Sequence, residues 1–187
     1  MNLDPAAGRF LIALPTLRDP NFVRTVVLLC EHNDEGTVGL IVNRPTQVKL
    51  SASIPGPLAE AREGDFLFQG GPVSPSHVFA LHNVPRLMGD SREVLPGVWF
   101  TPGSEGVAER LRQPPQPGEA LRLFAGYAGW GAGQLEAELQ QTAWIVGPAA
   151  ADLVYAATPK NVWSRALQAI GGPAAFLATA PEDPRLN

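Results

Sequence analysis

The sequence is poor in cysteine, with Cys30 as its single thiol. One cysteine cannot form a disulfide within the chain, which is typical of a protein from a reducing compartment. The chain also lacks a run of the roughly 20 apolar residues that a membrane helix needs. Its first residues carry no basic stretch, and the apolar run over residues 10–14 is too short for a signal-peptide core. We therefore expect a cytoplasmic protein that has no membrane contact.

Positive charge is scarce as well, with 14 Lys and Arg against 18 Asp and Glu, a net charge of -4 and a pI near 5.3. A general binder of nucleic acid or of anionic lipid needs a basic face, so we do not expect direct nucleic-acid binding. Hydrophobic residues make up 45% of the chain, which is globular composition. We expect one domain over residues 1–187, with a tail from about Pro173 that is mobile or loosely docked.

Clusters that would hold a metal or run a reaction are also lacking. The three histidines, His32, His77 and His82, do not have the spacing of a metal site, and no second cysteine is present to help them. Cys30 and His32 share a strand face, but a catalytic cysteine needs exposure and nearby positive charge, whereas Cys30 lies among apolar residues. We expect Cys30 to be buried and inert. The sequence predicts no catalytic residue, no metal and no cofactor, which favours a non-enzymatic protein while leaving catalysis open.

Two β-branched runs, residues 25–32 and 37–43, are joined by the polar turn 33–36 and predict a β-hairpin. Facing His32 with Thr37 pairs Cys30 with Gly39, Leu28 with Ile41 and Val26 with Asn43. That pairing puts Val26, Leu28, Cys30 and Ile41 on one face, and Val27, Leu29, Val38, Leu40 and Val42 on the other. Because both faces are apolar, both must be covered, so the hairpin is central.

The segment 121–139 is the most distinctive part of the chain. It predicts an apolar strand, a loop with glycines at 126, 129, 131 and 133, and a helix from Gln134. A glycine loop before a helix can bind phosphate, but the segment has neither Gly-x-Gly-x-x-Gly nor Gly-Lys-Ser/Thr. We expect a tight structural turn with Trp130 packed into it.

The remaining elements alternate between strands and helices. We expect strands over residues 9–14, 65–69, 77–82, 97–101 and 143–147, helices over 104–112, 148–155 and 159–170, a helical turn over 58–63 and irregular chain over 83–96. Ser104 is a candidate N-cap. Mixed elements with tight turns between strands favour an α+β fold with a mainly antiparallel sheet.

Four motifs in order resemble the YqgE/AlgH family of bacterial proteins. They are Arg-Thr-Val-Val-Leu-Leu-Cys-Glu-His-Asn (24–33), Gly-Leu-Ile-Val-Asn-Arg-Pro (39–45), Gly-Gly-Pro-Val (70–73) and Gly-Tyr-Ala-Gly-Trp-Gly-Ala-Gly-Gln-Leu-Glu (126–136). The resemblance extends from about Arg9 to Trp163. It implies a strongly bent sheet that closes into a partial barrel flanked by helices. The family's recurring label is a regulator of alginate synthesis genes, and no recognised DNA-binding module accompanies it here.

Arg44 is the leading candidate for a functional contact. The hairpin pairing puts Arg24, Asn43 and Arg44 at one end, and Pro45 restricts Arg44 to extended geometry. A guanidinium fixed beside a second arginine and an amide can receive an anion or a carboxylate. The alternative is a structural clamp in which Arg44 pairs with Asp19 or another acid.

Two functional hypotheses follow. The first is a non-enzymatic binding or regulatory protein with a protein or small-ligand partner. The second is a sensor or enzyme for a small anionic metabolite, with a pocket lined by Arg44, Gly70, Gly71 and Trp130. His82, at a predicted strand end, completes the candidate binding residues, although a hydrogen bond to a neighbouring loop is its simplest interpretation. Neither the partner nor the oligomeric state has a signature in these residues.

Overall fold

The fold is taken from a computed structural model that describes residues 3–53, 65–84, 90–103 and 105–180. The predicted helical turn at 58–63 and the predicted N-cap Ser104 lie outside these residues. The strands described are β1 (Arg9–Ala13), β2 (Val26–Asn33), β3 (Gly36–Ile41), β4 (Pro45–Lys49), β5 (Phe66–Gln69), β6 (Val73–His82), β7 (Arg92–Leu95), β8 (Val98–Thr101), β9 (Leu121–Gly131) and β10 (Trp144–Pro148). The helices are α2 (Glu105–Leu111), α3 (Gln134–Gln140), α4 (Ala151–Val154), α5 (Val162–Ile170) and α6 (Gly172–Leu177), with 3-10 turns η1 (Leu50–Ser53) and η2 (Pro159–Asn161).

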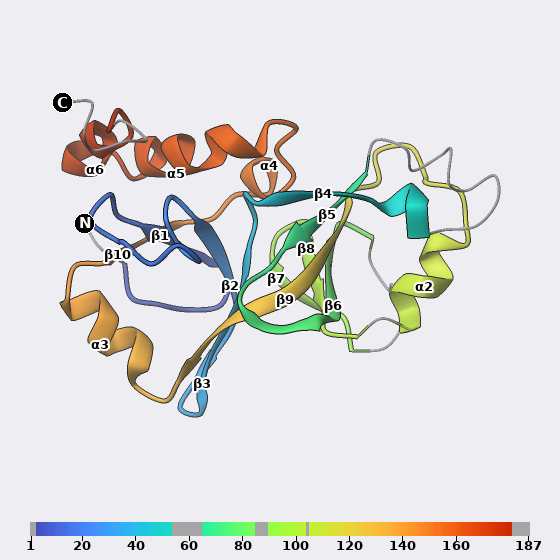
Figure 1. The fold of residues 1–187 in the computed structure, drawn as a ribbon, viewed down its shortest axis with the longest axis horizontal. Coiled ribbons are helices and arrows are strands. Elements are labelled where there is room, and N and C mark those ends of the chain that lie inside the picture. The colour runs from blue at the N-terminus through green and yellow to red at the C-terminus, as the bar shows by residue number, and fades with distance from the viewer. Residues whose placement is uncertain (1–2, 54–64, 85–89, 104, 181–187) are drawn as a thin grey trace.

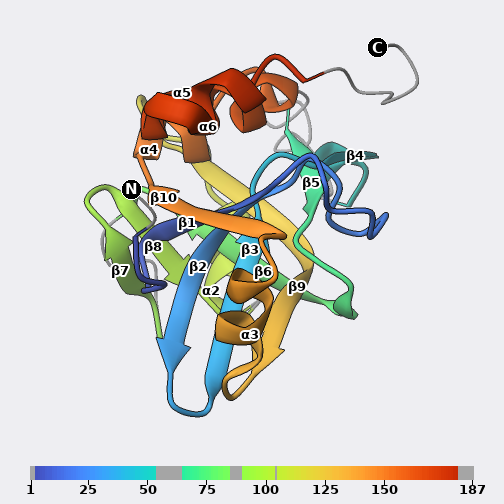
Figure 2. The same ribbon diagram turned by 90° about the vertical axis from the view of Figure 1, so that its left-hand side faces the viewer.

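The strands form one curled sheet in the order β10-β1-β2-β3-β9-β6-β8-β7, and β5 joins β4 to β9 beside this path (Figure 1). Among the described strands, only β5 and β9 pair in parallel. The sheet bends into a half-barrel with helices around it, which confirms the expected α+β class with a mainly antiparallel, strongly bent sheet (Figures 1 and 2).

Among the described helices, none combines the length and the apolarity that crossing a bilayer requires.

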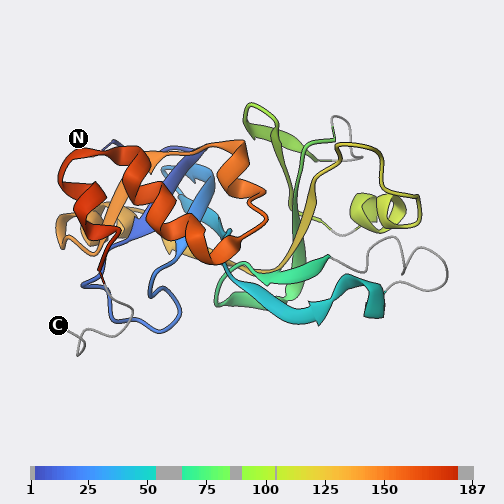
Figure 3. The ribbon, with the colours of Figure 1, turned by 90° about the horizontal axis from the view of Figure 1, so that it is seen from above.

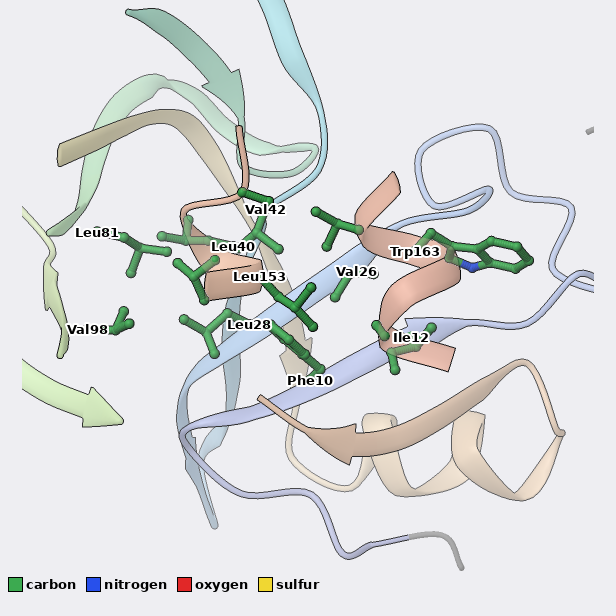
Figure 4. Packing of buried hydrophobic residues seen from close by; sticks show 14 of the residues in the cluster. Phe10, Ile12, Val26, Leu28, Leu40, Val42, Leu81, Val98, Leu153 and Trp163 are labelled. Carbon is green, nitrogen blue, oxygen red and sulfur yellow. The ribbon is translucent and has the colours of Figure 1, made fainter. Parts of the chain in front are cut away.

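The hairpin of β2 and β3 is central, as its two apolar faces predict. Helices α4 to α6 lie over one face of this part of the sheet and α3 over the other (Figures 1 and 3). Under α4 and α5, the strands contribute Phe10, Ile12, Val26 and Leu28, which pack with Leu153 and Trp163 (Figure 4). On the α3 side, Leu11, Val27 and Leu29 pack with Leu135, Trp130 and Trp144.

The predicted register of the hairpin is wrong beyond its first pairs. His32 faces Thr37, but the pairing shifts between Leu29 and Glu31, so that Leu29 faces Gly39. Cys30 is the extra residue of a β-bulge. One extra residue exchanges the faces of everything beyond it on the partner strand. Leu40 and Val42 therefore join Cys30 in one cluster and Ile41 lies in the other, the reverse of the predicted faces.

The glycine-rich segment is strand rather than loop. Gly126, Gly129 and Gly131 belong to β9, and only Gly133, with φ 71°, lies in the turn before α3. The reason is a chain crossing. Gly70 accepts a hydrogen bond from Ile41 N–H and donates one to the Ala125 carbonyl, on the β3 side of β9. The chain then passes over β9 to begin β6 on its other side.

Both crossing segments need glycine at their contact, because their backbones touch. A Cβ on Gly70 would lie 2.2 Å from the carbonyl oxygen of Gly126. A Cβ on Gly71 would lie 2.2 Å from the carbonyl carbon of Tyr127, and one on Gly126 would lie 2.7 Å from the oxygens of Gly71 and Val73. The glycines of β9 therefore allow two chain segments to approach closely. The prediction of a loop, which used the local pattern alone, is wrong.

Four further elements differ from the sequence-based expectation. β4 forms over residues 45–49, for which no strand is predicted. β7 lies in the stretch 83–96 that was expected to be irregular, and it pairs only with β8 at the end of the sheet order. α4 begins at Ala151 instead of Pro148, which closes β10. α6 forms over residues 172–177, for which no helix is predicted.

Candidate functional site

A cleft of about 710 Å³ lies where the turn after α4 meets β4, β5 and the start of β9. This volume is in the range of ligand pockets, roughly 300–1,000 Å³. The lining residues are Pro45, Thr46, Asp65, Phe66, Phe68, Pro115, Glu119, Ala120, Leu121, Arg122, Tyr155, Ala157 and Pro159.

Arg122 stands out among these residues as a cation in a strand of apolar neighbours. Burial alternates at the start of β9, where Leu121 and Leu123 are buried and Arg122 between them is only partly buried and lines the cleft. Its guanidinium donates to the carbonyl oxygen of Val154 at 2.7 Å and to that of Ala156, and it lies over the Phe68 ring, 4.6 Å from the centroid. Val154 is the last residue of α4 and Ala156 lies two residues beyond it, so both carbonyls are at the C-terminal side of this helix. Arg122 thus ties β9 to α4 across the base of the cleft.

The charge of Arg122 is only partly compensated. Burial lowers the pKa of Arg122 to about 10, so the side chain is still protonated at neutral pH. Among the described residues, no carboxylate lies within ion-pair distance of it. The hydrogen bonds to two carbonyls leave further N–H groups of the guanidinium unused. A partly buried cation without a direct ion pair is less well solvated than in water, and an anion in the cleft would stabilise it.

Tyr155 supplies a second donor beside Arg122. Its hydroxyl is buried, and no described residue forms a hydrogen bond with it. Burial raises the pKa of Tyr155, and the Arg122 charge acts against that rise, which shows how near the two groups are. The hydroxyl therefore keeps its proton at neutral pH. Buried polar groups in folded proteins almost always have a partner, and the hydroxyl of Tyr155, a residue of the cleft lining, has none among the described residues.

Two carboxylates also line the cleft. Glu119 pairs with Arg110, accepts a hydrogen bond from the Gln116 N–H at 2.8 Å, and has a side chain only 2% exposed. Asp65 acts on Arg122 from a distance and raises its pKa slightly against the effect of burial. The walls are therefore close to neutral overall, with the positive charge concentrated at Arg122.

The predicted cluster of Arg24, Asn43 and Arg44 does form, but as a clamp on the backbone. Arg44 donates to the carbonyl oxygens of Asn21 at 2.6 Å and of Pro20 and Val23 at 3.1 Å each. Burial lowers the pKa of Arg44, and Asp19 opposes this only through its charge. The geometry matches the clamp alternative, with main-chain carbonyls in the place expected for an acid.

The other two members of the cluster are engaged in the same way. Asn43 accepts the Val26 N–H at 2.9 Å and donates to the Arg24 carbonyl at 2.8 Å. Arg24 has a positive φ of 53°, lies over the Trp163 ring at 4.3 Å and donates to the Ala180 carbonyl. These contacts fix the loop before β2 against β3 and α5.

The remaining candidates do not gather at one pocket. Gly70 and Gly71 form the crossing over β9. Trp130 is 5% exposed and lines a second cavity of about 370 Å³ next to the β2–β3 turn. His82 is fully buried, and its Nε2 lies 2.8 Å from Thr101 Oγ1 of β8. Arg44, Gly70 and Gly71 line neither cavity.

Cys30 is 1% exposed, and burial raises the pKa of its thiol well above the ordinary value. The thiolate needed for nucleophilic attack is therefore disfavoured, in agreement with the prediction of an inert cysteine. Within the described ranges, no group of three or more His, Cys, Asp or Glu side chains is arranged to hold a metal ion.

Sequence reasoning missed Arg122 and Tyr155. Arg122 had one usable signal, since it is the single charge in the run Leu-Arg-Leu-Phe-Ala over residues 121–125. Tyr155 had none, because it lies at the end of a predicted helix and resembles any half-buried aromatic residue. Nothing local links two residues so far apart in the chain.

Comparison with known proteins gives consistent matches over nearly the whole chain. Residues 10–175 match the model of a family described as AlgH-like. A UPF0301 protein of Chlorobium chlorochromatii is 38% identical over 181 residues, which cover 97% of this chain and 95% of the relative. One of Streptomyces coelicolor is 43% identical over 185 residues, covering 96% and 94%.

Two solved structures share the fold. The solution structure of the AlgH protein from Pseudomonas aeruginosa has a TM-score of 0.73 at 29% identity, covering 97% of this chain and 98% of the other. The crystal structure of protein DIP2367 from Corynebacterium diphtheriae has a TM-score of 0.78 at 25% identity, covering 96% and 94%.

Proposed function

The chain belongs to the AlgH-like family of UPF0301 proteins, and within that family we propose that it acts as a non-enzymatic binding protein for a small organic anion. The ligand occupies the cleft at Arg122 and Tyr155. The observation that carries this proposal is the pairing at the cleft of two donors: the partly buried Arg122 guanidinium, which has no ion pair among the described residues, and the buried Tyr155 hydroxyl, which has no hydrogen-bond partner among them.

The protonation of these groups supports binding rather than catalysis. Groups that exchange protons in a reaction work best with a pKa near the operating pH. The pKa of Arg122 is about 10 and that of Tyr155 is raised from its ordinary value, so both stay protonated at neutral pH. Both are suited to donating hydrogen bonds to an anion that does not change chemically.

We propose further that the protein works in the cytoplasm and that any regulatory effect passes through this ligand and a protein partner. A single buried thiol suits a reducing compartment. The net charge of -4 disfavours direct contact with DNA, so binding to a random duplex should be absent or weak at every salt concentration.

A thermal-shift screen of small carboxylates and phosphate esters tests the proposal. A ligand at 100 times its dissociation constant stabilises the fold by about 2.7 kcal/mol. The hits should lose their effect in Tyr155→Phe and keep it in Tyr127→Phe, because Tyr127 lines the other cavity. A screen without hits, or hits indifferent to Tyr155, contradicts the proposal.

A further inference from the structure

We infer that the anionic group of the ligand is a single carboxylate, carried on a flat apolar body such as an aromatic ring system. This inference rests on the proposed binding function and narrows it to one ligand class, the aromatic monocarboxylates. Three features of the cleft lead to it: its charge balance, the shape of its donors and the nature of its walls.

The charge balance favours a monoanion. Arg122 is the one cation among the described lining residues, and Asp65 lies close enough for its charge to act on Arg122. The other wall carboxylate, Glu119, is neutralised by Arg110, which does not line the cleft. A phosphate monoester carries about -1.5 to -2 charges near neutral pH, more than one guanidinium compensates. Since the lining with Asp65 is close to neutral, a carboxylate, which adds one negative charge, is accommodated at a lower electrostatic cost than a phosphate monoester.

The donors suit a planar group. The guanidinium of Arg122 is held in place by the carbonyls of Val154 and Ala156 and by the Phe68 ring beneath it. A planar fork of N–H groups matches the planar carboxylate. The Tyr155 hydroxyl adds one neutral donor from the residue between those two carbonyls. A carboxylate has two oxygens and can accept from both residues at once.

The walls suit an apolar body. Pro45, Phe66, Phe68, Leu121 and Pro159 line the cleft, and Phe66 is 37% exposed although it is a large hydrophobic residue. Burial of apolar surface is favourable by about 25 cal/mol per Å², so a flat apolar ligand gains by covering these side chains. The volume of about 710 Å³ leaves room for more than one ring.

Three probes with one body separate the possible head groups: 2-naphthoate, 2-naphthyl phosphate and 2-naphthalenemethanol. Binding of each is measured by calorimetry with the full chain, with Tyr155→Phe and with Tyr127→Phe as the matched control. We expect 2-naphthoate to bind most tightly to the unaltered protein. Tyr155→Phe should weaken it by about tenfold or more, because a hydrogen bond to a charged group is lost. Tyr127→Phe should leave its affinity unchanged.

The outcomes separate this inference from the proposal on which it rests. Tighter Tyr155-dependent binding of 2-naphthyl phosphate overturns the carboxylate inference and keeps the anion-binding cleft. Equal affinity for 2-naphthalenemethanol and 2-naphthoate would show that the negative charge of the head group does not contribute to binding, and would overturn the carboxylate inference. If none of the probes binds at millimolar concentration, both the inference and the binding function fail. Thermal melting of Tyr155→Phe checks the fold, which should be intact since no described residue bonds to that hydroxyl.

Discussion

Trp130 and Trp144 donate their indole N–H groups to the same carboxylate oxygen of Glu138, at 3.0 and 2.9 Å. Their ring centroids are 6.0 Å apart with the planes at 82°, and Phe22 packs against both rings. Since Trp130 lies on β9, Trp144 on β10 and Glu138 on α3, one carboxylate joins the helix to two strands that are not neighbours in the sheet.

Replacing Glu138 by Ala should therefore destabilise the protein strongly. Both indole N–H groups lose a charged acceptor in a nearly buried environment, which should lower the free energy of unfolding by on the order of 3 kcal/mol. Urea denaturation followed by tryptophan fluorescence measures this change. Glu136→Ala is the control, because Glu136 is half-exposed and its ion pair among the described residues is with His32, at 3.6 Å. Its effect should stay below about 1 kcal/mol. Equal effects of the two substitutions would refute the bridging role.

Arg44→Ala should destabilise the fold by about 2 kcal/mol, since three carbonyl oxygens lose their charged donor. Arg18 lies in the same loop, is exposed and serves as the control, with Arg18→Ala expected to be neutral. Chemical denaturation of both variants gives the comparison. An Arg44→Ala protein as stable as the unaltered one would show that the clamp is unimportant and would return Arg44 to the binding candidates.

Gly70→Ala should prevent normal folding or lower the free energy of unfolding by more than about 4 kcal/mol. The added methyl group would lie 2.2 Å from the Gly126 carbonyl oxygen, and both partners are backbone that cannot rotate away. Gly103→Ala is the matched control, because a Cβ there meets nothing within 4 Å. Soluble yield and melting temperature report the difference. A Gly70→Ala protein that melts like the Gly103→Ala protein would mean that the strands do not cross this closely.

His82 should make stability fall as the pH drops below about 6.5, the ordinary pKa of the unfolded residue. Burial lowers the pKa of His82 in the folded protein, against smaller opposing effects of Val84 and Glu119. The unfolded chain then binds the proton more readily, and this group contributes a slope of at most about 1.4 kcal/mol per pH unit.

The measurement is the free energy of unfolding between pH 7.5 and 5, for the unaltered protein and for His82→Gln. The variant should show a shallower slope, whatever its stability at pH 7.5. His77→Gln is the control, because His77 is exposed and its replacement should leave the slope unchanged. Parallel curves for His82→Gln and the unaltered protein would rule out His82 as the source.

Sequence patterns predicted the fold well where burial follows a local period. The hairpin of β2 and β3 was found because apolar residues on both faces must be covered, and Val26 to Leu29 are fully buried. The helix α5 was found from its apolar spacing, with Val162, Trp163, Ala166 and Leu167 buried as that spacing requires. In both cases the information lies within a few neighbouring residues.

The sequence-based prediction was wrong where one extra residue, or one contact with a distant part of the chain, changes the structure that a pattern forms. The bulge at Cys30 reversed the faces of β3, although the pattern of apolar residues allows either register. The local pattern around the β9 glycines predicts a loop. The contact that requires glycine there, with the crossing chain at residues 70 and 71, lies more than fifty positions away in the sequence.

Four features can be derived from the amino-acid sequence alone, because each depends on composition, local period or motif order: the α+β class, the central hairpin, the burial of Cys30 and the resemblance to a family. The candidate site, in contrast, exists only in the folded chain. Arg122 and Tyr155 meet because the curl of the sheet brings the start of β9 against the end of α4, and the Val154 and Ala156 carbonyls fix the guanidinium there. That meeting is a property of long-range packing, which no local pattern of residues encodes.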